Sequence, residues 1–79
     1  MKIDKKKLAK SLKEPKINFI YKNIKDIKRP KILEFGVRDG ISTNLFLSIC
    51  EKNNGNLISV DVDDCSRLFN NKRWKFFQT

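Results

Sequence analysis

The chain has 79 residues, 34% of them charged, and a net charge of +9 at pH 7. This length allows one small domain with a thin core, and no apolar run approaches the roughly 18 residues of a membrane-spanning helix. The N-terminal lysines are not followed by a continuous apolar segment, so a secretory signal is not expected. Histidine is absent, and Cys50 and Cys65 lack metal-ligand spacing, so we expect no metal site and reduced thiols in a cytoplasmic protein.

The positive charge is concentrated at one end of the chain. Residues 1–31 contain 12 Lys and Arg against three acidic residues, whereas residues 32–79 contain six of each sign. This division predicts a basic helical segment over residues 1–30 and a domain over residues 31–79. Lysine clusters attract phosphate backbones, but without a known nucleic-acid motif we expect only weak, non-specific, salt-sensitive binding of nucleic acid. No membrane binding is expected.

Two helices are predicted in the basic segment. Residues 1–12 favour a short helix with Asp4 as its N-cap, which Pro15 interrupts. Residues 16–28 form a second helix, ended by Pro30, with apolar residues on one face and lysines opposite. The apolar face consists of Ile17, Ile20, Ile24 and Ile27. We expect both helices to pack on the sheet of the following domain, over its second face and the edge of its first strand.

Residues 31–79 alternate between strand and helix patterns. Strands are expected over residues 31–37, 57–62 and 74–79, and helices over residues 41–53 and from Asp63 or Asp64 to residue 69. The longer helix is followed by a stop signal, Asn53-Asn54-Gly55, and residues 70–71 form a turn. The aromatic residues of the last strand are expected in the core and not on a base-stacking platform.

This alternation predicts an α/β fold with parallel strands joined by right-handed crossovers. With both helices of residues 31–79 on one face, the strand order is 3-2-1. The first strand would then lie at an edge, although its apolar sequence is typical of a central strand. Because an exposed apolar edge promotes association, we expect a partner chain or a second copy to pair with it.

The connection after the first strand has the features of a ligand-binding turn. It contains Gly36 and Gly40 and leads into a helix, whose first backbone N–H groups favour an anion or a carboxylate. Asp61, near the end of the second strand, can accept hydrogen bonds from both hydroxyls of a ribose. Together these residues predict a pocket for a molecule that carries a ribose and a small charged group.

These residues resemble class I S-adenosylmethionine-dependent methyltransferases, in particular small-molecule enzymes of the catechol O-methyltransferase kind. The first motif of that family is a strand ending E-x-G-x-x-x-G, with a serine soon afterwards, and residues 34–42 here read E-F-G-V-R-D-G-I-S. The resemblance covers residues 31–79. It implies a truncated Rossmann-like methyltransferase fold, preceded by the two N-terminal helices.

The resemblance also implies a site for S-adenosylmethionine. Its residues would be Gly36 and Gly40 beside the methionine portion, Glu34 near the amino group, Ser42 on the carboxylate, Asp61 on the ribose, and Arg38. Arg38 replaces the family's middle glycine, and its side chain can contact the ligand carboxylate or remain solvated.

Catalytic residues are not identified by this resemblance. The family transfers a methyl group from the sulfonium to a nucleophile, an oxygen in the small-molecule type, but its fourth strand, catalytic loop and acceptor-binding segments would lie beyond Thr79. We therefore expect a cofactor-binding portion that is incomplete as an enzyme and has little transferase activity alone. A partner chain could supply the missing half.

Other interpretations remain open. An NAD-type site is disfavoured because Arg38 occupies the place of the second glycine of G-x-G-x-x-G. Asp63 and Asp64 suit helix capping better than ligand binding, and the hydroxyls of Ser42 and Thr43 suit capping as well as ligand contact. A non-catalytic basic module, which binds nucleic acid or a partner protein through residues 2–31, is the alternative from another functional class.

Overall fold

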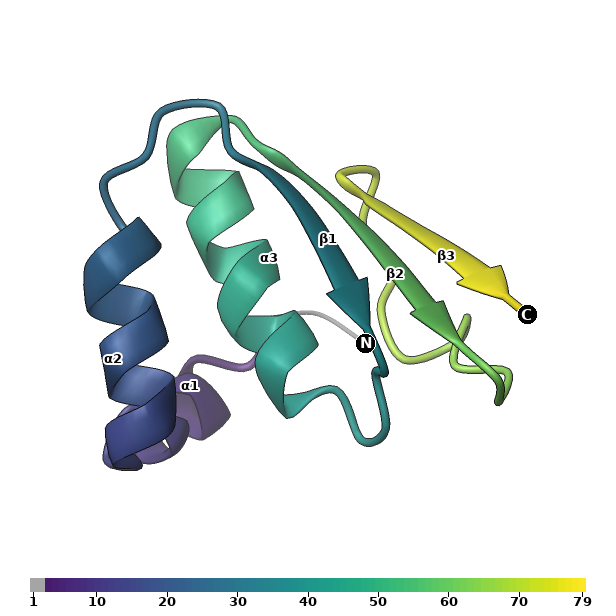
Figure 1. The fold of residues 1–79 in the computed structure, drawn as a ribbon, viewed down its shortest axis with the longest axis horizontal. Helices are drawn as coiled ribbons and strands as arrows, with labels where there is room; N and C mark the ends of the chain where they lie inside the picture. The colour runs from purple at the N-terminus through teal and green to yellow at the C-terminus, as the bar shows by residue number, and fades with distance from the viewer. Residues whose placement is uncertain (1–2) are drawn as a thin grey trace.

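Three helices and three strands occupy residues 3–79, the part of the chain that the computed structural model describes (Figure 1). In chain order they are α1 (Lys5–Ser11), α2 (Pro15–Ile24), β1 (Lys31–Phe35), α3 (Ile41–Asn53), β2 (Asn56–Asp61) and β3 (Trp74–Gln78). The predicted helix over residues 1–12 begins at residues 1–2, which lie outside the described part. Asp4 is the N-cap of α1, as predicted, and its side chain accepts hydrogen bonds from the backbone N–H groups of Lys6 and Lys7.

The sheet is parallel, in the order β1-β2-β3, which is the predicted order 3-2-1 counted from the other edge. β2 pairs with both neighbours: Leu57 lies opposite Ile32 of β1 and opposite Trp74 of β3. β1 therefore lies at an edge of the sheet, as the sequence predicted. All three strands are slightly shorter or shifted relative to the predicted ranges.

The core lies between α3 and one face of the sheet. Leu47 and Cys50 of α3 pack with Leu57 and Trp74 of the sheet and with Phe69, and all five are buried. The rings of Phe69 and Trp74 meet edge to face, with centroids 5.5 Å apart. The limits of α3 are those predicted, because the left-handed residues Gly40 and Asn54 flank it.

The predicted second helix of the domain, from Asp63 or Asp64 to residue 69, is wrong. Turns and bends occupy this stretch. The backbone N–H of Asp63 donates to Asp61, and both the N–H and the hydroxyl of Ser66 donate to Asp64. Such local side-chain bonds compete with helix formation, and a helix this short has a costly nucleus. Cys65 and Phe69 are buried instead as anchors of an irregular connection.

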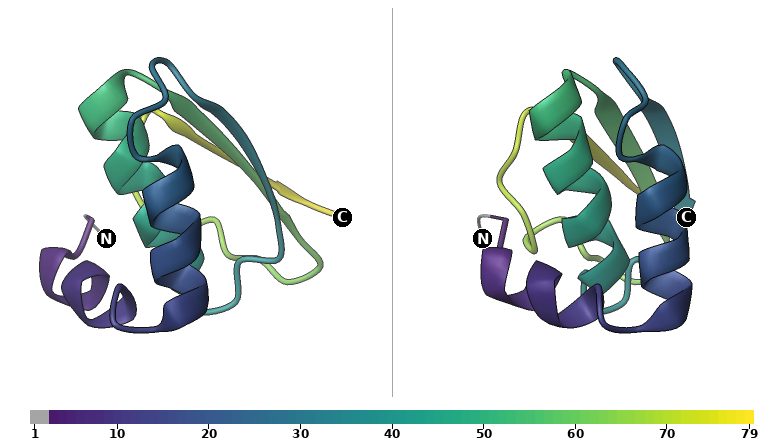
Figure 2. Two further views of the ribbon diagram at one scale, coloured as in Figure 1. Left: turned by 60° about the vertical axis from the view of Figure 1, so that its left-hand side comes forward. Right: turned by 90° about the vertical axis from the view of Figure 1, so that its left-hand side faces the viewer.

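The predicted placement of the N-terminal helices also needs correction. Both α1 and α2 pack against α3, on the side of the sheet that α3 already covers (Figure 2). The side-chain amide of Asn44 binds the backbone of Asp4 twice: its Oδ1 accepts from the N–H at 2.7 Å, and its Nδ2 donates to the carbonyl at 2.9 Å. This pair fixes α1 on α3.

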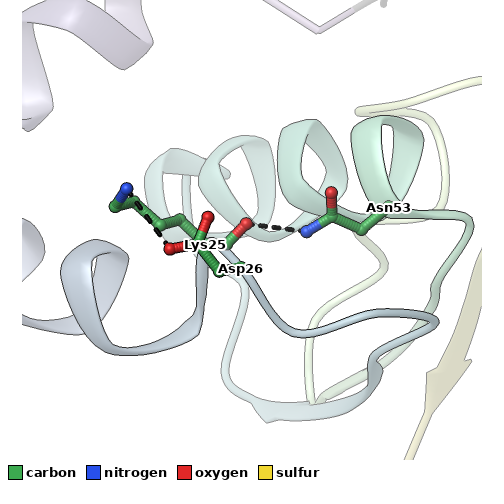
Figure 3. Close-up of polar contacts among 3 residues, drawn as sticks. All are labelled: Lys25, Asp26 and Asn53. Carbon is green, nitrogen blue, oxygen red and sulfur yellow. Dashed lines mark hydrogen bonds and ion pairs between the residues drawn. The ribbon is translucent and has the colours of Figure 1, made fainter.

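Asn53, the last residue of α3, holds the connection between α2 and β1. Its side-chain Nδ2 donates to the carbonyl of Lys25 at 2.7 Å (Figure 3). Its own carbonyl accepts from the backbone N–H of Arg29 at 2.8 Å. The ion pair between Lys25 and Asp26, 3.4 Å long, is exposed and contributes little to stability. The two amide contacts therefore keep the end of α2 beside α3 and away from the second face of the sheet.

The isoleucine face of the second predicted helix is only partly covered. α2 begins at Pro15, which suits the first helical turn because proline lacks an N–H group. Ile17, Ile20 and Ile24 are half-buried, and Ile27 lies beyond the helix and is 48% exposed. No helix within residues 3–79 combines the length and the apolar content that crossing a bilayer requires.

Candidate functional site

The loop between β1 and α3 has an unusual backbone. Gly36, Arg38 and Gly40 have φ angles of 90°, 53° and 87°, all in the left-handed region. A Cβ atom on Gly40 would lie 3.0 Å from the ring of Phe69, so both backbone and packing favour glycine there. A Cβ on Gly36 would meet no atom within 4 Å. Gly36 thus opens onto free space, where a ligand can approach the backbone.

Asp61 holds this loop. Its Oδ2 accepts hydrogen bonds from the backbone N–H groups of Val37, at 2.7 Å, and Arg38, at 3.2 Å, while its Oδ1 accepts from Asp63, at 3.0 Å. The backbone N–H of Asp63, followed by those of Val37 and Arg38, lowers the pKa of the Asp61 carboxyl to about 2. The sequence predicted that Asp61 and the glycine loop would meet, and the structure brings them into direct contact.

The low pKa of Asp61 has a measurable consequence. We expect the Asp61 carboxyl carbon to titrate with a midpoint near 2 in an NMR pH series, below the roughly 3.9 of an unfolded chain. Because the folded pKa is the lower one, the stabilisation is complete above the unfolded pKa and is lost as the pH falls through the folded value. The Asp61→Asn variant assigns the resonance, and a midpoint of 4 or higher would contradict the three backbone contacts.

Glu34 lies on the other side of the loop, inside the protein. It is 5% exposed, and its carboxylate accepts hydrogen bonds from the hydroxyls of Ser42, Thr43 and Ser59. The Thr43 and Ser59 contacts are both 2.7 Å long, and the indole N–H of Trp74 donates to Ser59 at 2.9 Å. Within residues 3–79, every buried side-chain nitrogen and oxygen has a partner. We call Glu34, Ser42, Thr43, Ser59 and Trp74 the buried network.

Ser59 and Trp74 were not among the predicted site residues, and the Thr43 hydroxyl was expected only to cap the helix or to contact a ligand. The sequence pattern could have indicated Ser59, because Glu34 and Ser59 occupy inward positions of neighbouring strands, where the register places them opposite each other. A buried carboxylate requires hydrogen-bond donors, so polar residues facing it could have been expected. Ser42 was predicted, and it links the two parts of the site: its hydroxyl donates to Glu34 while the residue stays half-exposed at the start of α3.

Arg38 contributes through its backbone. Its N–H donates to Asp61, and its carbonyl accepts a long, 3.9 Å contact from the thiol of Cys65. Burial, followed by the nearby carboxylates Asp61, Asp63 and Asp64, raises the pKa of that thiol and keeps it protonated as a donor. Both cysteines are free and buried.

Two open pockets differ in their relation to this loop. One of about 260 Å³ lies beside it, between α1 and the start of α3. It is lined by Lys7, Lys10, Ser11, Glu14, Asp39 and Ile41. A larger one of about 980 Å³ reaches Ser48, Lys52 and Asn71, towards the other end of α3. Ligands of parallel α/β sheets bind at the carboxyl ends of the strands. The loop between β1 and α3 is therefore the better candidate for a ligand site, although the pocket towards the other end of α3 is larger.

Comparison of the chain with models of known protein families, with curated proteins and with solved structures gave no match. No group of three or more His, Cys, Asp or Glu side chains within residues 3–79 is arranged to hold a metal ion. The geometry itself offers a left-handed glycine loop, an ionised carboxylate bound to it, and a hydroxyl at the first turn of the following helix.

Proposed function

We propose that residues 31–79 bind S-adenosylmethionine and that the chain is the cofactor-binding portion of a methyltransferase of the small-molecule O-methyltransferase type. The main support is the contact between Asp61 and the glycine loop at the carboxyl end of the parallel sheet. A carboxylate has about four acceptor positions. In Asp61, three of them are occupied by the backbone N–H groups of Val37, Arg38 and Asp63. Asp61 is partly exposed, so it can still accept from a ribose hydroxyl.

The methionine portion of the cofactor would lie over Gly36. That position opens onto free space, so ligand atoms can come close to the backbone. The Ser42 hydroxyl already donates a hydrogen bond to Glu34, so its oxygen can only accept a hydrogen bond from a ligand. In this proposal Ser42 therefore does not bind the ligand carboxylate, the role that the resemblance implies, but receives a hydrogen bond from the ammonium group of the ligand. Glu34 acts as a positioning residue behind it.

We also propose that the fold is a truncated Rossmann-like methyltransferase fold. The three strands would correspond to the first half of a Rossmann-like methyltransferase sheet. The unpaired edge of β1 would be where a partner chain, or a second copy, adds its strand, because an exposed edge is a template for pairing.

Calorimetry with S-adenosylhomocysteine tests the site. We expect saturable binding by the wild-type chain and about 10- to 100-fold weaker binding by Asp61→Asn, since hydrogen bonds to a charged group are worth about 1.5–3 kcal/mol. The substitution preserves the shape of the side chain and one acceptor oxygen for the loop. Asp63→Asn is the matched control, because the Asp63 side chain is exposed two positions away.

Two results would reject the assignment. The first is undetectable binding by a wild-type chain whose circular dichroism shows that it is folded. The second is equal affinity in the Asp61→Asn and Asp63→Asn variants, which would place the ligand elsewhere.

A further inference from the structure

The face of the sheet that points away from α3 is apolar and open. It carries Leu33 and Phe35 of β1, Ile58 and Val60 of β2, and Phe77 of β3, with Val62 just beyond β2. Phe35 is 78% exposed, Leu33 57% and Phe77 54%. Register places Leu33 beside Ile58, and Val60 between Phe35 and Phe77. We call these six residues the open face.

A parallel sheet of this kind normally has both faces covered. In this chain α1 and α2 lie on the α3 side, so neither covers the open face (Figure 2). Contiguous apolar patches on a protein surface mark binding sites. The exposed aromatic rings of Phe35 and Phe77 are of the residue class enriched at such interfaces.

The charges around the open face indicate what covers it. Lys31 and Lys75 are exposed on the same side of the sheet, Lys75 directly beside Ile58, and none of the strand residues pointing to this side is acidic. A second copy that docked through the same face would bring its own Lys31 and Lys75 to the contact, and like charges would then meet. An acidic partner would be attracted instead.

We propose that the open face binds an amphipathic helix of another protein, whose apolar stripe lies across Phe35, Val60 and Phe77 and whose flanking Asp or Glu residues pair with Lys31 and Lys75. Apolar residues at helical spacings of three and four form a stripe wide enough to cover such a patch. This inference is independent of the proposed cofactor site, because the open face and the buried network lie on opposite sides of the sheet.

Two synthetic peptides of about 18 residues, roughly 27 Å as a helix, test the proposal by fluorescence anisotropy. Both carry the same leucine stripe, flanked by glutamates in one and by lysines in the other. We expect the full chain to bind the glutamate peptide at least tenfold more tightly at low salt, with a difference that shrinks as salt is added. The variant Lys31→Glu/Lys75→Glu should reverse the preference.

Variants on the two sides of the molecule locate the binding surface. Phe35→Ser/Phe77→Ser should weaken binding of the glutamate peptide at least tenfold. Phe19→Ser is the matched control, because Phe19 is 68% exposed on α2, and it should leave binding unchanged. All three positions are exposed, so melting curves should show that each variant folds.

Three outcomes would overturn the proposal. They are equal binding of the two peptides, equal losses in Phe35→Ser/Phe77→Ser and Phe19→Ser, or a stable dimer in sedimentation equilibrium that Phe35→Ser/Phe77→Ser dissociates. The last result would assign the open face to a second copy of the chain.

Discussion

Glu34→Ala should lower the free energy of unfolding by about 3 kcal/mol or more, a large part of the stability of so small a domain. The Glu34 carboxylate accepts hydrogen bonds from three hydroxyls, those of Ser42, Thr43 and Ser59. Each buried donor left without an acceptor costs about 1–3 kcal/mol, and the missing side chain leaves a cavity between β1 and α3. Some of these hydroxyls can rotate to other acceptors, so the total loss of stability should be smaller than the sum of three such costs.

Urea unfolding measured by tryptophan fluorescence suits this test, because Trp74 is the only tryptophan and belongs to the buried network. Glu34→Gln retains the volume and one carbonyl oxygen, so its effect should be clearly smaller. Glu51→Ala, at an exposed glutamate of α3, should change stability by no more than about 0.5 kcal/mol. Similar urea midpoints for the two alanine variants would show that the network does not stabilise the fold.

Gly55→Ala should also be strongly destabilising, by about 3 kcal/mol, the upper end of the range for overpacking. A Cβ at this position would lie 2.5 Å from the carbonyl oxygen of Pro30 and would also collide with its ring. Pro30 cannot move aside easily, because its carbonyl accepts the N–H of Asn56 at 2.8 Å. Gly55 is fixed as well, since its own N–H donates to the carbonyl of Cys50.

Gly36→Ala separates steric overlap from backbone strain. Its φ is +90°, so alanine is strained there by about 1–2 kcal/mol, but its Cβ would meet no neighbour. We therefore expect the urea midpoint to fall less for Gly36→Ala than for Gly55→Ala. The reverse order would mean that the contact with Pro30 relaxes at little cost.

The sequence predicted best the elements that have local signals. Both ends of α3 follow from Gly40 and from Asn53-Asn54-Gly55, and the parallel strand order follows from the alternation of strand and helix patterns. The stretch 64–69 misled the prediction because the local pattern carries no information about Phe69, which must reach Trp74 in the core. The position of α1 depends on the pairing of Asp4 with Asn44, forty residues away, and no periodicity encodes such a contact.

The sequence predicted which residues of the candidate site lie close together, but it did not predict the hydrogen bonds between them. Strand-end logic places Asp61 next to the glycine loop, and the structure agrees. That Asp61 binds the backbone of Val37 and Arg38 depends on the loop's left-handed residues, one of which is an arginine that sequence rules do not expect there.

The central position of β2 has a consequence for how the chain acquires its structure. Within residues 3–79 no paired strands are joined by a hairpin, because both pairs are parallel. Ile32 and Trp74 both pair with Leu57, and a long connection separates each of them from it. Pairing of the strands therefore cannot start at a tight turn and spread from it. Each strand pair must close a long loop before the hydrogen bonds between its strands stabilise it. Neither edge strand can join until β2 is in place, so the six residues from Asn56 to Asp61 control the order of assembly of the whole sheet.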